Sequence, residues 1–142
     1  MKILEVKTED RALGSYGEGE AAKLLRKLGY KILERNFVIS GHEIDIIAES
    51  KDVLAFVEVK TRSVANKRAW EPRPASAVTP EKQRSIIMAA SAYAAHRASG
   101  KHIRLDIIEV YVSGDSGSWK VEDIKHLPAA FDKNTAYKRR RS

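Results

Sequence analysis

The chain has 142 residues, with 43% hydrophobic and 32% charged residues, a formal net charge of +7 and no cysteine. This length predicts one domain, and the lack of cysteine excludes disulfide scaffolds, thiolate metal centres and cysteine nucleophiles. Apolar runs such as Val53–Val57 reach five residues, whereas a membrane-spanning helix needs about 20, and the N-terminus lacks the apolar core of a signal peptide. We therefore expect a cytoplasmic protein that does not enter a membrane.

Apolar spacing predicts the elements in chain order. A helical face runs over about residues 10–28 and ends at Gly29. Alternating segments predict strands, and Thr79-Pro80-Glu81 has the cap, proline and acid of a helix start. The expected strands are 31–39, 43–48, 53–61, 103–112 and 119–123, with the second helix at about 80–99. The order αβββαββ predicts a mixed α/β fold over residues 1–131, followed by a basic, disordered tail at 132–142.

The positive charge is concentrated in two places. Residues 60–84 hold seven basic residues against two acidic ones, and residues 138–141 are all basic. Such a distribution suits nucleic acid, because each neutralised phosphate releases counterions. The alternatives are a solvated loop with a solubilising tail, or a tail that binds an anionic membrane.

Carboxylates on two neighbouring strands are the main functional signal. On the strand 53–61, Glu58 and Lys60 share a face that is otherwise apolar. Asp45 interrupts an isoleucine-rich strand, where a carboxylate needs a partner or a metal. A short turn joins the two strands, so Asp45 and Glu58 can be cross-strand neighbours that bind Mg²⁺, with Mn²⁺ as an alternative. An Asp45–Lys60 ion pair is the competing interpretation.

Three further polar side chains are candidates. On the first helix, the apolar spacing places Glu20 nearer the middle of the inward face than Glu18. On the second helix, Gln83 shares a face with apolar residues, either as a functional group or as a satisfied amide near the helix start. The four histidines show no ligand spacing, which argues against a zinc site.

Ordered short motifs over residues 13–112 resemble the YraN-like family of bacterial proteins. They include Gly17-Glu18, Gly41-x-Glu43-Ile44-Asp45, Phe56-Val57-Glu58-Val59-Lys60-Thr61-Arg62, Lys82-Gln83 and Arg104-x-Asp106. That family in turn resembles the PD-(D/E)XK nucleases and archaeal Holliday-junction resolvases. This resemblance implies a restriction-endonuclease-like three-layer fold with a central mixed five-stranded sheet flanked by helices.

The resemblance also implies site roles. Asp45, Glu58 and the Val59 carbonyl would bind Mg²⁺, and Lys60 would orient the attacking water or stabilise the developing charge. Glu18, rather than Glu20, matches the helix-1 acid, and Gln83 matches a recurrent polar position.

We therefore expect a Mg²⁺-dependent nuclease acting on DNA, including branched DNA. The basic residues expected at the phosphate backbone are Arg62, Lys67, Arg68, Lys82 and Arg84. By analogy with resolvases, a homodimer is expected. The alternative is a nucleic-acid-binding protein that retains the nuclease fold without turnover.

Overall fold

A computed structural model describes residues 2–64, 78–97 and 100–137. The elements are α1 (Lys2–Lys27), β1 (Lys31–Ile39), β2 (His42–Glu49), β3 (Val53–Ser63), α2 (Pro80–His96), β4 (His102–Ser113), β5 (Lys120–Leu127) and α3 (Lys133–Ala136). The predicted order αβββαββ is confirmed, and α3 is added at its end. Within the described residues, no helix has the length and apolarity needed to cross a membrane.

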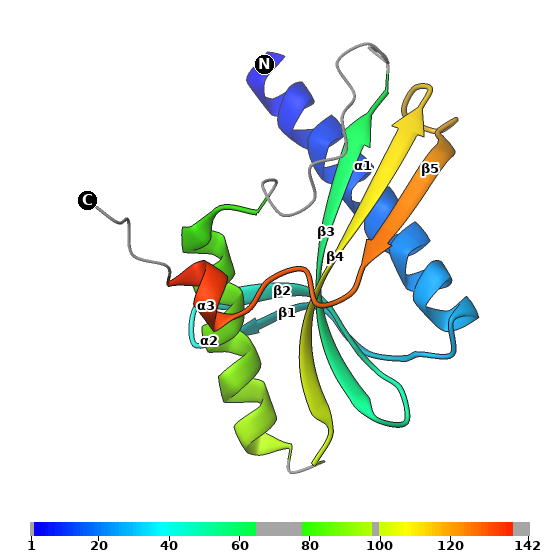
Figure 1. Cartoon of the computed structure of the whole chain (residues 1–142). Helices are drawn as coiled ribbons and strands as arrows, with labels where there is room; N and C mark the ends of the chain where they lie inside the picture. The colour runs from blue at the N-terminus through cyan, green and yellow to red at the C-terminus, as the bar shows by residue number, and fades with distance from the viewer. Residues whose placement is uncertain (1, 65–77, 98–99, 138–142) are drawn as a thin grey trace.

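The five strands form one sheet in the order β1-β2-β3-β4-β5 (Figure 1). The β3–β4 pair is parallel and the other three neighbouring pairs are antiparallel. Helix α2 belongs to the crossover that a parallel pair requires. The expected mixed five-stranded sheet flanked by helices is therefore confirmed.

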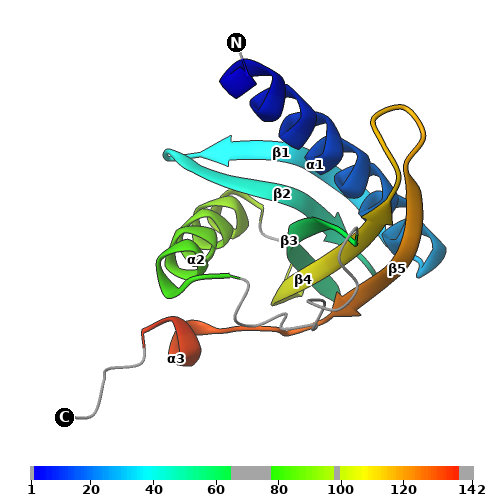
Figure 2. The same cartoon turned by 90° about the horizontal axis from the view of Figure 1, so that it is seen from above.

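The helices lie on opposite sides of the sheet and make three layers (Figure 2). One core lies under α2 and includes Leu54, Phe56 and Ile107. The other lies under α1 and includes Val57 and Ile108. Alternate residues of β3 and β4 supply the two cores, so both faces of these strands are buried, as their continuous apolar sequences predict.

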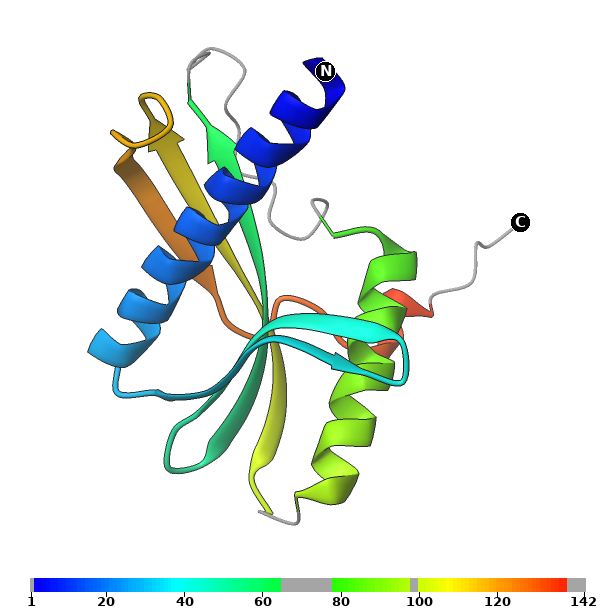
Figure 3. The ribbon, with the colours of Figure 1, turned by 180° about the vertical axis from the view of Figure 1, so that it is seen from behind.

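Strand β2 stops pairing with β3 near the middle of both strands. The pairing between the two strands runs from Glu49–Leu54 to Ile46–Val57. Beyond it, the β1–β2 hairpin swings across α2 (Figure 3). Ile44 and Ile46 are two residues apart, yet Ile44 packs in the α2 core and Ile46 in the α1 core. The strand therefore twists strongly at Asp45, which lies where the two strands part.

The ends of several elements differ from the sequence prediction. Helix α1 begins at Lys2 instead of about residue 10, because the polar run 7–11 separates Ile3, Leu4 and Val6 from the apolar face that starts at Leu13. Helix α2 ends at His96 rather than near 99, and β5 extends to Leu127 rather than ending near 123.

Part of the segment predicted to be a disordered tail is folded. Asp132 and Thr135 form a reciprocal capping box at the start of α3. Ala136 is buried, and α3 lies against α2 (Figure 1). The basic residues 138–141 lie outside the described residues.

Candidate active site

The place where β2 and β3 part brings Asp45, Glu58 and Lys60 together. The backbone N–H of Val59 donates to Asp45 Oδ2 at 2.8 Å. Because the β2–β3 pairing stops at Ile46–Val57, the Asp45 carboxylate satisfies a strand donor beyond the end of that ladder. Lys60 Nζ lies 3.5 Å from Glu58 Oε1. The two strands thus hold both acids and the lysine in one cluster, as predicted.

Both acids of this pair are protonated more easily than ordinary carboxyls. Burial, followed by the charge of Asp45, raises the pKa of Glu58 to about 7. Burial also raises the pKa of Asp45, against the lowering effects of the Val59 N–H and the Lys82 charge. Glu58 is 5% exposed, and its Oε2 atom has no hydrogen-bond partner among the described residues. A buried, unpartnered carboxylate oxygen is well suited to a cation.

Glu18 of α1 lies near this pair. Burial and then the Asp45 charge raise the pKa of Glu18 to about 7. With its amide nitrogen facing the helix, Asn36 donates to Glu18 Oε1 at 2.7 Å; the backbone of Asn36 has a φ of 50°. Glu20 instead pairs with Lys23 at 3.4 Å. The contacts therefore favour Glu18, the acid that the family resemblance indicates, over Glu20.

A close helix–strand contact sets the position of Glu18. A Cβ atom placed on Gly17 would lie 1.8 Å from Thr61 Oγ1. Only glycine lets α1 approach β3 this closely, and the adjacent Glu18 is thereby brought toward the carboxylate pair.

The three predicted polar residues of α2 have different surroundings. Lys82 lies close enough to lower the pKa of both Asp45 and Glu58, in each case against the stronger effect of burial. Gln83 donates to the Val78 carbonyl at 2.9 Å, which is the satisfied-amide interpretation. Arg84 donates to the Ala136 carbonyl at 2.9 Å and so contacts α3.

The donor set fits a hard divalent cation that retains water. Among the described residues, no three histidine, aspartate or glutamate side chains are grouped as a ready-made metal cage. Mg²⁺ differs from metals that need such a cage, because one or two carboxylates with several waters are usual for it. Asp45 and the unpartnered oxygen of Glu58 meet that requirement. The third predicted ligand is the carbonyl of Val59, the residue whose N–H donates to Asp45.

The sequence analysis missed Glu109 of β4. It is the register partner of Lys60 and is 1% exposed. Its Oε2 atom accepts hydrogen bonds from Tyr111 Oη at 2.7 Å and from Arg62 Nε at 3.3 Å. Arg62, a predicted nucleic-acid contact, therefore lies beside the cluster. Two other predicted contacts, Lys67 and Arg68, lie outside the described residues.

Another buried acid, Asp106 of β4, is the register partner of Val57 and so lies on the α1 side of the sheet. Arg104 binds it through two hydrogen bonds of 2.8 Å. His126 Nε2 lies 2.8 Å from its Oδ2, and the Ala129 N–H donates to it at 3.0 Å. Burial alone raises the pKa of Asp106, but the hydrogen bonds from His126 and Arg104 outweigh it and hold the pKa below its ordinary value. These hydrogen bonds give the motif Arg104-x-Asp106 a structural role.

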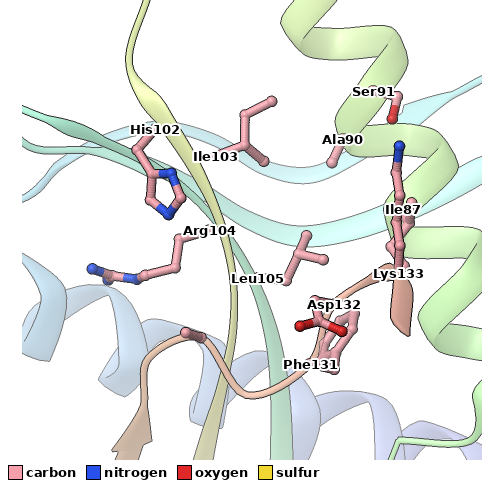
Figure 4. A pocket seen from close by; sticks show the side chains of 11 residues that line it. Ile87, Ala90, Ser91, His102, Ile103, Arg104, Leu105, Phe131, Asp132 and Lys133 are labelled. Atoms are coloured by element: carbon pink, nitrogen blue, oxygen red, sulfur yellow. The ribbon is translucent and has the colours of Figure 1, made fainter. Parts of the chain in front are cut away.

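A pocket of about 390 Å³ lies apart from the acid cluster, between α2, β4 and α3. Figure 4 shows Ile87, Ile103, Leu105 and Phe131 around it. Asp45, Glu58 and Lys60 do not line this pocket. The acid cluster is therefore not part of this cavity.

The model of "Uncharacterised protein family UPF0102" matches residues 17–110, which include Glu18, Asp45, Glu58 and Glu109. The chain belongs to family UPF0102. This confirms the resemblance to the YraN-like family.

Curated UPF0102 proteins match over most of their length. The relative from Chlorobaculum parvum is 45% identical over 121 residues, covering 84% of this chain and 91% of the relative. The UPF0102 protein from Geobacter metallireducens is 41% identical, covering 87% and 94%. One from Clostridium perfringens is 40% identical, covering 84% and 96%. The UPF0102 domain is therefore nearly the whole of these proteins.

Proposed function

We propose that this UPF0102 protein is a Mg²⁺-dependent nuclease that hydrolyses phosphodiester bonds of DNA, including branched DNA. The observation that carries the proposal is the pairing of half-buried Asp45 with buried Glu58, with Lys60 beside them. Two adjacent carboxylates with raised pKa values make a costly arrangement for a purely structural site. A divalent cation between them would relieve both their repulsion and the unpartnered Glu58 oxygen.

Each residue has a role in this proposal. Asp45, Glu58 and the Val59 carbonyl would hold Mg²⁺, which supplies an acidified water and charge stabilisation at the phosphate. Lys60 Nζ is on the same strand face as Glu58, where it can orient the attacking water or donate to the phosphate oxygen that gains charge. Glu18, held by Asn36, can accept a hydrogen bond from a water of the ion.

A basic rim beside the acid cluster supports a nucleic-acid substrate. Lys82 of α2 and Arg62 of β3 lie at this rim. Arg84 is less suited to the same role, because its guanidinium contacts the Ala136 carbonyl and the ring of Tyr137. The proposal therefore assigns phosphate contact first to Arg62 and Lys82.

Cleavage of labelled four-way-junction, flap, duplex and single-stranded DNA tests this function. The purified chain is compared with Asp45→Ala and Lys60→Ala in Mg²⁺ or Mn²⁺. Lys23→Ala is the matched control, because Lys23 forms an exposed pair with Glu20 on α1. We expect cleavage by the wild type and by the control, and a loss of more than about 100-fold in the two site variants, since even residues around a metal ligand contribute 10–100-fold.

Two results would count against the proposal. Cleavage that persists in Asp45→Ala or with EDTA would place the activity elsewhere or in a contaminant. Binding of junction DNA without cleavage of any substrate, and unaffected by Asp45→Asn, would favour the binding-module alternative.

A further inference from the structure

Glu109 is a buried acid that the proposed chemistry does not use. It lies on β4 opposite Lys60 of β3. Register partners on parallel strands point to the same face, so Glu109 shares the face of Glu58 and Lys60. Its Oε1 atom is buried without a hydrogen-bond partner among the described residues. A buried acid needs hydrogen-bond partners that satisfy its oxygens.

Arg62 donates to Glu109 from Nε, and its side chain is 49% exposed while that of Glu109 is 1% exposed. Lys60 and Lys125 are the register partners of Glu109 on the two neighbouring strands. A guanidinium has five N–H donors, so, as far as the described residues go, the two terminal nitrogens of Arg62 are available to a ligand. The hydroxyl of the buried Tyr111 fixes the same Glu109 oxygen at 2.7 Å. Glu109 thus holds the Nε atom of Arg62, while the rest of this half-exposed guanidinium can reach a ligand.

We propose that Arg62, positioned by Glu109 and Tyr111, binds the phosphate that flanks the one cleaved at Asp45 and Glu58. This inference rests on the proposed function. Arg62 follows Lys60 by two residues on one strand, a separation of about 6.6 Å at 3.3 Å per residue. Neighbouring phosphates of one nucleic-acid strand are separated by a similar distance. The substrate strand would therefore lie along the C-terminal half of β3.

The positioning role of Glu109 predicts an unusual direction for the change in DNA-binding affinity when its charge is removed. Removing an acid near bound DNA should strengthen binding if only net charge matters. If Glu109 instead fixes the guanidinium for a two-pronged contact, removing its charge should weaken binding, because a mobile arginine loses more freedom when it binds. The two interpretations predict opposite changes in affinity.

Fluorescence anisotropy with labelled single-stranded and four-way-junction DNA, without divalent ions and over a salt series, measures this change. The variants are Arg62→Ala, Glu109→Gln and their double variant, with Tyr111→Phe as a second way to loosen Glu109. Glu122→Gln is the matched control, because Glu122 is an exposed acid of β5. Thermal unfolding establishes that each variant is folded.

We expect Arg62→Ala to weaken binding about tenfold and to lower the salt slope by roughly 0.7–0.9, the value for one phosphate contact. Glu109→Gln and Tyr111→Phe should weaken binding several-fold, whereas Glu122→Gln should leave it unchanged or slightly tighter. The double variant should bind no more weakly than Arg62→Ala alone, because the two residues act through one contact.

Three results would overturn the inference while the proposed function stands. They are tighter binding by Glu109→Gln, additive losses in the double variant, and an unchanged salt slope in Arg62→Ala. If the wild type binds no nucleic acid in low salt, both the inference and the proposed nuclease function are wrong.

Discussion

The backbone N–H of Val59 and the carboxylate of Asp45 are joined by a 2.8 Å hydrogen bond across the gap between β2 and β3. The acid therefore has a structural task, since it satisfies a donor beyond the end of the strand pairing. It also belongs to a pair of mutually repelling carboxyls. Substitutions of Asp45 can separate these two effects.

Asp45→Asn keeps an oxygen for the Val59 N–H and removes the repulsion, so we expect stability equal to or above that of the wild type. Asp45→Ala leaves the donor without this acceptor, and we expect it to be about 1–3 kcal/mol less stable than Asp45→Asn. Urea unfolding of the three proteins without metal measures the difference. Equal stability of the two variants would contradict a structural role for the hydrogen bond.

The stability of the metal-free protein should fall as pH rises from about 4.5 to about 7. Glu58 and Glu18 each have a pKa raised to about 7 from 4.5, so the folded chain binds more protons than the unfolded chain over this interval. Stability that the protonated carboxyls contribute is complete below about 4.5 and is lost as they ionise. Melting temperatures between pH 4.5 and 8 test this, and Glu58→Gln should flatten the profile.

A divalent cation should reverse that trend at high pH. Metal ligation needs ionised carboxylates, so protons compete with the ion. We expect Mn²⁺ or Mg²⁺ to raise the melting temperature at pH 8 and to have little effect near pH 5. Asp45→Asn should lose most of the increase at pH 8. An increase independent of pH and of Asp45 would indicate binding elsewhere.

Gly17→Ala should destabilise the domain, by roughly 1–3 kcal/mol. The added methyl would lie 1.8 Å from Thr61 Oγ1, so α1 must move away from β3. Gly14→Ala is the matched control, because among the described residues no atom outside its chain neighbours and the backbone of α1 lies within 4 Å of its added Cβ. Alanine favours a helix interior over glycine by up to about 1 kcal/mol, so this control should be stabilising. Chemical denaturation gives both values.

Asp106→Asn should be among the most destabilising single substitutions, at about 3–5 kcal/mol, because it breaks a buried carboxylate's ion pair and leaves half-buried Arg104 without its counterion. Glu20→Gln breaks an exposed ion pair with Lys23 and should change stability by less than about 0.5 kcal/mol. Urea unfolding compares the two. Similar small effects would show that the hydrogen bonds around Asp106 are redundant.

The sequence predicts the strands well because a period of two residues is a local property. Asp45 and Glu58 could be paired from this period and from the short turn between their strands. The same signal was available for Glu109, an acid between Ile108 and Val110. No short turn joins β4 to β3, so the sequence does not reveal that Glu109 lies beside Lys60.

Tertiary contacts explain the other differences. The helical spacing favours Glu20 over Glu18. The rotation of α1 about its axis, however, depends on the approach of Gly17 to Thr61, which the spacing does not reveal. The surroundings of Gln83 and Arg84 depend on α3, since Thr135 lies 3.5 Å from the Gln83 amide and Ala136 accepts from Arg84. A four-residue helix has no periodicity, and only its Asp132–Thr135 cap could have revealed it.

The parallel pairing of β3 with β4 also has a consequence for the order of folding. Strands β1, β2 and β3 are joined by short turns, so Asp45 and Glu58 can meet through local pairing. Strand β4 must close a loop that contains α2 before it reaches β3, and such distant pairing is slow to form. We therefore expect the two carboxylates to come together early, and Glu109 to arrive beside Arg62 only when β4 docks.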